Sequence, residues 1–149
     1  MPLPVSLSER ADVKVLAPIH CPPLREVELN AACGFPSPAA DYAKESFNLA
    51  DYLLLRPNAT FVVGMTGDAM IEAGIFDGDK LFVDTSIEPE DGHIVLAFID
   101  GDLTVRRLRF VDSRPVLEPA NPDFSDRTPE DMESFSIEGV VVSSARKFV

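Results

Sequence analysis

Residues 94–110 read IVLAFIDGDLTVRRLRF, so two apolar runs flank the pair Asp100-Gly101. An Asp-Gly pair accepts the positive φ values of a type I′ turn, and this stretch therefore predicts a β-hairpin. Side chains alternate between the two faces of a strand, so Arg106 should share a face with Leu108 in the second arm. Arg106 is thus expected on a partly apolar face of the hairpin.

Further strand-like runs lie on both sides of the hairpin. The predicted strands cover residues 60–65, 81–84, 115–118 and 137–142, and the turn signals between them are Asp77-Gly78-Asp79, Asp91-Gly92 and Asn121-Pro122. Residues 49–55 predict a short helix that Arg56-Pro57 ends and Asn48 caps. The pattern predicts a mainly β protein, a single compact domain of short bent strands with one or two short helices over residues 49–149.

Residues 1–32 have a different texture. They contain five of the thirteen prolines and no glycine, and they show neither a helical nor an alternating period. We expect an extended N-terminal arm, for which a disordered tail is one interpretation. The other interpretation is docking of parts of the arm on a surface, because the arm is more apolar than a solvated tail requires, at Val13, Val15, Leu16, Ile19 and Leu24.

Length and charge exclude several classes of function. A chain of 149 residues can bury one core, but it is short for a catalytic domain plus a separate DNA-binding domain. A net charge of −12 repels phosphate backbones, so we expect no direct nucleic-acid binding and any link to DNA through a partner protein. No signal-peptide pattern and no membrane-spanning run is visible, which predicts a soluble cytoplasmic protein with reduced cysteines.

Three blocks in a fixed order carry a resemblance to a known family. The first is ACGFPSPAADY at residues 32–42, the second is TGDAMI at residues 66–71 followed by GIFDGD at residues 74–79, and the third is the hairpin with Gly92-His93 before it. Together they resemble the LexA/UmuD self-cleaving, S24 peptidase-like family, and UmuD in particular. The resemblance covers about residues 32–149 and implies the β fold of the LexA/UmuD C-terminal domain. It also implies that Cys33-Gly34 is the cleavage site and that residues 33–48 are the cleavage segment and linker.

The resemblance also locates the catalytic positions. The family cuts with a Ser-Lys dyad, whose serine falls on Ala69 and whose lysine falls on Arg106 in this chain. Alanine has no oxygen to attack with, and a guanidinium does not lose its proton in proteins, so neither catalytic role can be filled. Thr66 is the nearest hydroxyl in the block, three positions upstream. The chain is therefore predicted not to cut itself, and the substitutions fit either an engineered trap of the uncleaved form or a natural pseudo-enzyme.

UmuD-like proteins act through partners, and the resemblance implies the same partners here. These are a second copy in a homodimer, a UmuC-like Y-family polymerase and the RecA filament, within the SOS response to DNA damage. A chain that cannot cut itself should stay in the uncleaved, restraining form unless an active partner cuts Cys33-Gly34, and its arm can pack on its own subunit or across the dimer. The alternative is a LexA-like or phage-type transcriptional repressor that lacks its DNA-binding part, and an active peptidase related to signal peptidases is disfavoured by Ala69 and Arg106.

Other candidate sites have simpler readings. His20, Cys21, Cys33 and His93 match no zinc spacing, and Asp77, Asp79 and Asp84 lack the ligand pattern of a calcium loop, so turn formation explains them better. We expect no metal and no cofactor. The acidic residues of 123–133 are either a solvated loop or a docking site for a basic partner.

Overall fold

The computed structural model describes residues 13–15, 24–27 and 43–149 of the chain. His20, Cys21 and the expected cleavage site Cys33-Gly34 lie outside the described residues. The strands are β1 Val13–Val15, β2 Leu24–Val27, β3 Ala43–Phe47, β4 Thr60–Gly64, β5 Lys80–Asp84, β6 Ile94–Ile99, β7 Asp102–Val111, β8 Arg114–Glu118 and β9 Phe135–Ala145. One α-helix, α1 Leu49–Leu53, and three single turns of 3₁₀-helix, η3 Pro57–Ala59, η4 Ile71–Ala73 and η5 Met132–Ser134, complete the described elements.

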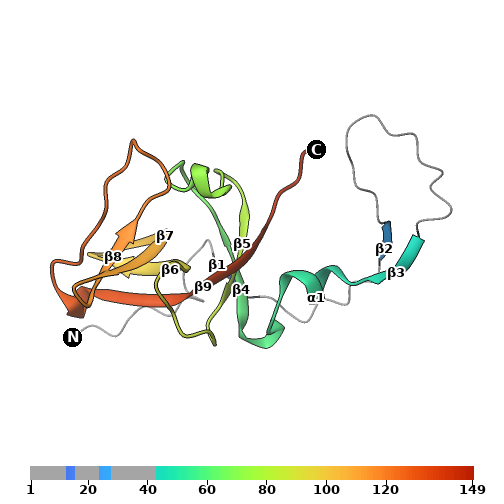
Figure 1. Cartoon of the computed structure of the whole chain (residues 1–149), viewed down its shortest axis with the longest axis horizontal. Coiled ribbons are helices and arrows are strands. Elements are labelled where there is room, and N and C mark those ends of the chain that lie inside the picture. Colours follow the sequence, from blue (N-terminus) through green and yellow to red (C-terminus); the bar gives the residue numbers. More distant parts are fainter. Residues whose placement is uncertain (1–12, 16–23, 28–42) are drawn as a thin grey trace.

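Seven of the strands form one antiparallel sheet in the order β1-β4-β5-β9-β6-β7-β8 (Figure 1). The mainly β prediction is confirmed, and each of the strands predicted from the turn signals is present within a few residues of its expected bounds. The central hairpin is also confirmed: β6 pairs with β7, and Asp100 and Gly101 have φ values of 49° and 90° as a type I′ turn requires. A second turn with two positive φ values joins β7 to β8. Its residues are Asp112 and Ser113, and neither is a glycine.

Strand β9 joins the two halves of the sheet. Its second half pairs with β5 and its first half pairs with β6, with a register shift on each side. Two core clusters result, one with Val105 of β7 and one with Leu108, residues of opposite parity on the same strand. Both faces of β7 are therefore covered, which confirms the alternation expected for the hairpin.

Gly139 lies where β9 passes from one partner strand to the other. A Cβ atom at this position would lie 2.5 Å from Cγ1 of Val83 and 3.0 Å from the carbonyl oxygen of Asp84. Both neighbours belong to β5, which is paired on its two sides and has little freedom to move. Only glycine lets the strands approach this closely.

The short strands β1, β2 and β3 were not predicted. Val13 and Val15 of β1 pair with β4 at the edge of the main sheet, while β2 pairs with β3 in a separate two-stranded ladder. Runs of three to five residues are too short to show alternation, so their pairing depends on the strand that lies beside them. The pairing of β1 with β4 agrees with the interpretation that a part of the arm docks on the main sheet, whereas Leu16 and Ile19 lie outside the described residues.

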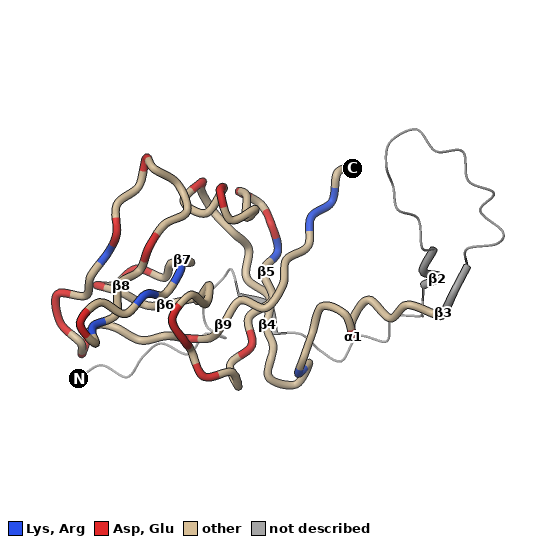
Figure 2. Tube along the Cα trace, in the orientation of Figure 1, with Lys and Arg blue, Asp and Glu red and all other residues tan. Residues whose placement is uncertain are grey.

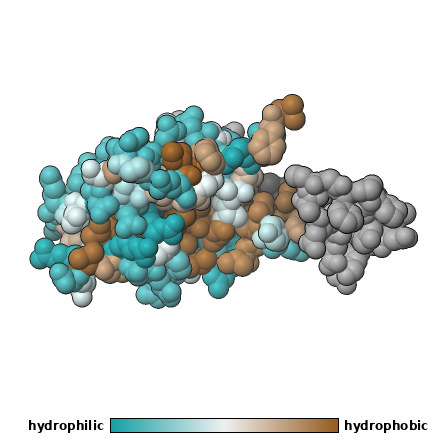
Figure 3. Space-filling model, turned by 45° about the horizontal axis from the view of Figure 1, so that its top comes forward, coloured by the Kyte–Doolittle hydropathy of each residue, from teal (hydrophilic) through white to brown (hydrophobic). Residues whose placement is uncertain are grey.

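Helix α1 begins as predicted, because Asn48 accepts a hydrogen bond from the amide of Asp51 at 3.1 Å, but it ends at Leu53, two residues before the apolar run does. Tyr52 and Leu55 near its end are exposed. Figure 1 shows α1 leading away from the sheet toward β2 and β3, and Figure 3 shows apolar side chains gathered at that end of the body. Acidic residues are prominent in the loops around the sheet (Figure 2). Among the described residues, no helix is long and apolar enough to cross a membrane.

Candidate functional site

The site is a cleft of about 500 Å³ on the main sheet. Its walls are the end of β4 with the loop that follows it, the start of β7, Leu96 of β6 and Phe124. Ala69 and Arg106, which lie 37 positions apart in the sequence, both line it. The structure thus brings together the two positions that the sequence analysis singled out, whereas Cys33-Gly34 lies outside the described residues.

Hydrogen bonds to neighbouring loops hold the loop that carries Ala69. The amide of Gly67 donates to Oδ1 of Asp77 at 2.7 Å, and Nδ2 of Asn121 donates to the carbonyl oxygen of Asp68 at 2.8 Å. The carbonyl oxygen of Ala69 itself accepts from the amide of Ala120 at 2.8 Å. Asn121 is buried, so its amide acts as an internal brace. Asp77 and Asn121 were predicted from the sequence only as turn residues, so this role was missed.

Ala69 is buried at 3% exposure, and its side chain brings no polar atom to the cleft. Thr66 also lines the cleft, but it is exposed. Of the described cleft residues, only Asp68 and Arg106 carry a charge. The cleft therefore combines apolar walls with one carboxylate and one guanidinium.

Arg106 is half-buried and only partly satisfied. Its Nη1 donates to the carbonyl oxygen of Val105 at 2.7 Å, while its Nε is buried without a hydrogen-bond partner. The guanidinium carbon lies 5.9 Å from the centroid of the Phe124 ring. Burial, and then repulsion by the charge of Arg127, lower the pKa of Arg106 below its ordinary value. Such a group still stays charged at neutral pH, because an arginine gives up its proton only at very alkaline pH.

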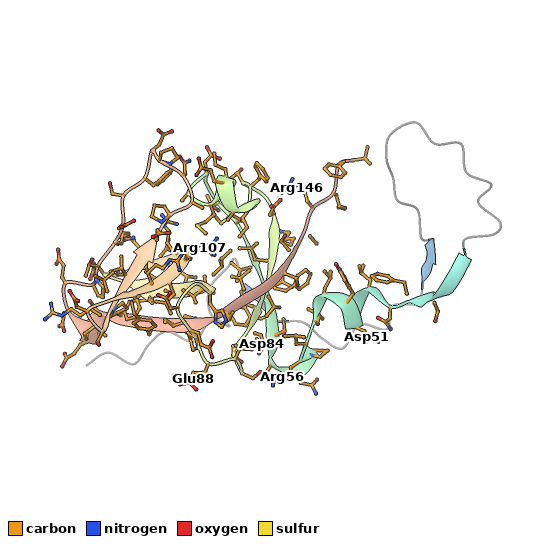
Figure 4. The ribbon with its side chains drawn as sticks, viewed as in Figure 1. Asp51, Arg56, Asp84, Glu88, Arg107 and Arg146 are labelled. Atoms are coloured by element: carbon orange, nitrogen blue, oxygen red, sulfur yellow. The ribbon has the colours of Figure 1, made fainter. Side chains whose placement is uncertain are left out.

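An ion pair between the buried carboxylate of Asp79 and the exposed guanidinium of Arg146 supports the turn that precedes β5. Asp79 is 1% exposed, and its two oxygens accept from Nε and Nη2 of Arg146 at 2.5 and 2.8 Å. Oδ2 also accepts from the amide of Phe76 at 2.9 Å, and the guanidinium lies 4.3 Å from that residue's ring. Figure 4 shows Arg146 at the end of β9, near the turn before β5. The hydrogen bonds from Arg146 lower the pKa of Asp79, and this pair, separated by 67 positions, was not predictable from the sequence.

Replacing Arg146 by methionine should destabilise the protein at neutral pH, because the carboxylate of Asp79 would stay buried without its partner. The pKa of Asp79 is depressed in the folded state, so the stabilisation from the pair is present above its ordinary pKa of 3.8 and is lost as the pH falls through the depressed value. The difference in urea midpoint between the variant and the unchanged protein should therefore be large at pH 7 and shrink toward pH 3. Arg109→Met, which removes an exposed partner of Asp91, is the matched control and should change the midpoint little at pH 7. An equal effect of the two substitutions would contradict the buried role of Asp79.

The weighed metal ligands have other partners. Within the described ranges, no three His, Cys, Asp or Glu side chains lie together as a metal site requires. Nδ1 of His93 accepts from the amide of Glu90 at 3.1 Å, and Oδ1 of Asp84 accepts from the amide and hydroxyl of Ser86. Asp84 is the last residue of β5, and Arg56 precedes β4; both are labelled in Figure 4. Nη1 of Arg56 donates to the hydroxyl of Ser86 at 2.9 Å. These side chains fix turns.

The described part of the chain is thus a mainly β domain with a cleft between a glycine-containing loop and a neighbouring hairpin. The chain belongs to the Peptidase S24-like family, whose sequence model matches residues 25–142. The chain is 42% identical over 116 residues to Protein ImpA of Salmonella typhimurium, which covers 76% of this chain and 79% of that protein. It is also 42% identical over 114 residues to Protein MucA of Escherichia coli, covering 76% and 77%.

A more distant relative has a different name. The LexA repressor of Stenotrophomonas maltophilia (strain R551-3) is 36% identical over 109 residues, which is 73% of this chain and 51% of the repressor. The part of the resemblance that names the family is thus confirmed. The likeness to the repressor is confined to about half of that protein.

Proposed function

We propose that this chain is a UmuD-like accessory and regulatory subunit of a UmuC-like Y-family polymerase, which acts in the cytoplasm during the SOS response and does not cut itself. The observation that carries the proposal is the joint placement of Ala69 and Arg106 in one braced cleft. The relatives ImpA and MucA, matched over more than three quarters of their length, support a UmuD-like role over a repressor.

The chemistry of the cleft supports the non-cleaving part of the proposal. Hydrolysis of a peptide bond by a Ser-Lys pair needs a hydroxyl and a neutral amine, whose pKa must fall well below its ordinary value of about 10.4. At the nucleophile position the chain has the methyl group of Ala69, and at the base position it has the permanently charged Arg106. The loop that carries Ala69 is held by hydrogen bonds at the wall of the cleft, which is compatible with a domain that folds and binds partner proteins without cutting itself.

A repressor function is the second candidate, and the likeness to LexA favours it. A net charge of −12 opposes it, because direct binding to an operator requires cationic groups that displace counterions from the phosphates.

Light scattering at micromolar concentration should give about twice the monomer mass of 16.3 kDa, because a UmuD-like subunit acts as a symmetric homodimer. The same measurement after addition of a UmuC-like polymerase should show a larger complex that contains the dimer. A chain that stays monomeric at this concentration, with and without the polymerase, would contradict the proposal. An unrelated acidic protein of about the mass of the polymerase, added in its place, controls for nonspecific association.

The purified chain should show no measurable affinity for duplex or single-stranded DNA at physiological salt, and it should reach primed DNA only when the polymerase is present. Fluorescence anisotropy of labelled DNA, with and without the polymerase, separates the two candidates. Tight, sequence-specific binding by the chain alone would favour the repressor.

A further inference from the structure

Arg106 has donor groups that the described residues do not use. Its Nη1 is bonded to a neighbouring carbonyl oxygen, but its Nε is buried and unpartnered, and no described carboxylate forms an ion pair with it. A guanidinium taken out of water normally regains the lost hydration through a counterion or full hydrogen bonding. Among the residues that the structure describes, this guanidinium therefore has no counterion.

The charges around Arg106 favour an anion. Arg127 lies close enough to lower the pKa of Arg106 by repulsion, although its own guanidinium pairs with Asp102 at 3.3 Å. Asp68 is the one described acidic residue of the cleft wall, and it is exposed, so water screens its charge. The aromatic ring of Phe124 lies near the guanidinium. It offers no oxygen or nitrogen acceptor that would compete with an anion for the N–H groups of Arg106.

The walls of the cleft suit a peptide. Strand β8 pairs with β7 from Arg107 onward, so the start of β7, which lines the cleft, has a described partner strand on one side only, where β6 pairs with it. An extended chain can add to such an edge through main-chain hydrogen bonds. Val63, Met65 and Leu103 supply apolar surface beside it.

We propose that the cleft is a binding site for a peptide carboxylate, with Arg106 as the residue that recognises the anion. A planar guanidinium matches a carboxylate in two parallel hydrogen bonds, and these are stronger where water is excluded. The substitution that removes the base of the family's dyad thus supplies a new ligand group at the same place. The proposal goes beyond the polymerase-accessory function and does not depend on which partner the subunit serves.

The test compares a peptide acid with its amide. The probe is the seven-residue peptide VELNAAS, which is residues 27–33 with Cys33→Ser to prevent disulfides, made with a free C-terminal carboxylate or with an amide. The free acid should bind the intact protein about 10- to 100-fold more tightly than the amide, as a charge-assisted hydrogen bond predicts. Titration calorimetry gives both affinities, and the nitrogen-15 NMR signal of the Arg106 Nε–H should shift on addition of the acid.

Variants assign the effect to Arg106. Arg106→Gln should lose the preference for the acid, and Arg106→Lys should keep part of it, because a lysine holds the charge without the paired donors. Arg107→Gln is the matched control, because that residue is the next one along β7 and donates to the carbonyl oxygen of Gly92 at 3.0 Å, away from the described cleft wall. It should leave the preference unchanged.

Three outcomes would overturn the proposal. Absence of binding and of any Nε–H shift at millimolar peptide overturns it, as does equal binding of acid and amide that Glu28→Gln leaves unchanged, or a preference that survives in folded Arg106→Gln. A peptide with Glu28→Gln separates the two sources of the carboxylate, because acid and amide would bind equally and lose affinity together if the side chain were the ligand. That outcome would keep Arg106 as the anion ligand and replace the terminal carboxylate by an acidic side chain.

Discussion

Ala69→Ser combined with Arg106→Lys should restore cleavage between Cys33 and Gly34, with loss of residues 1–33, whereas neither substitution alone should do so. A serine beside a guanidinium has no proton acceptor, and a lysine beside alanine has no nucleophile. Cleavage therefore requires both substitutions. The loop that carries Ala69 is braced by Asn121, so a serine at this position inherits a fixed place in the cleft. The expected change is from no detectable product to conversion of most of the chain.

The pH dependence identifies the base. A lysine in the place of Arg106 would be half-buried, so its pKa should lie below the ordinary value of about 10.4, and the rate should rise with pH as more of the amine becomes neutral. Intact mass after incubation at pH 7 and pH 10 measures this, and a RecA filament should accelerate the reaction. Cleavage in the unchanged chain, or none in a folded double variant, would show that the catalytic positions are assigned wrongly. Carboxylate binding by Arg106 is a separate property, so this experiment and the peptide titration can fail independently.

Gly139→Val should destabilise the protein by about 3 kcal/mol or more, and Gly139→Ala by about 1–3 kcal/mol, because overpacking at a fixed contact forces strands apart. The added Cβ would lie 2.5 Å from Cγ1 of Val83, and the extra methyl groups of valine add further contacts to the paired β5. Urea unfolding of the three proteins gives the difference directly. Ser144→Val, an exposed position on the same strand, is the matched control and should change stability by less than about 0.5 kcal/mol. Equal effects at the two positions would contradict the close approach of β5 and β9.

The parts of the fold that were predictable are those encoded by neighbours in sequence. The β6–β7 hairpin follows from an Asp-Gly pair between apolar runs, and the cap of α1 follows from Asn48. β1 was missed because its edge position depends on β4, far along the chain. The register shifts of β9 were missed for a similar reason, because they depend on two partner strands at once.

The candidate site was likewise predictable only in part. Ala69 and Arg106 were found because they fall inside blocks that resemble a family, and the structure places both in one cleft. The brace of Asn121 and the pair of Asp79 with Arg146 were missed, since a buried polar contact between distant residues leaves no periodic pattern in the sequence. The missing partner of Arg106 is also invisible in the sequence, because an unpaired cation is defined by what surrounds it in space.

The position of β9 between β5 and β6 has a consequence for the order of events during synthesis. β9 is the last strand in chain order, yet it lies in the middle of the seven-stranded sheet. The other strands of that sheet form two groups, β1-β4-β5 and β6-β7-β8, and no described ladder joins them directly. β4 with β5, and the β6–β7–β8 meander, can pair locally as they leave the ribosome, but they join only when residues 135–145 arrive between them. We therefore expect the sheet to close after translation, and a chain halted before residue 135 to present two unfinished edges to chaperones and proteases.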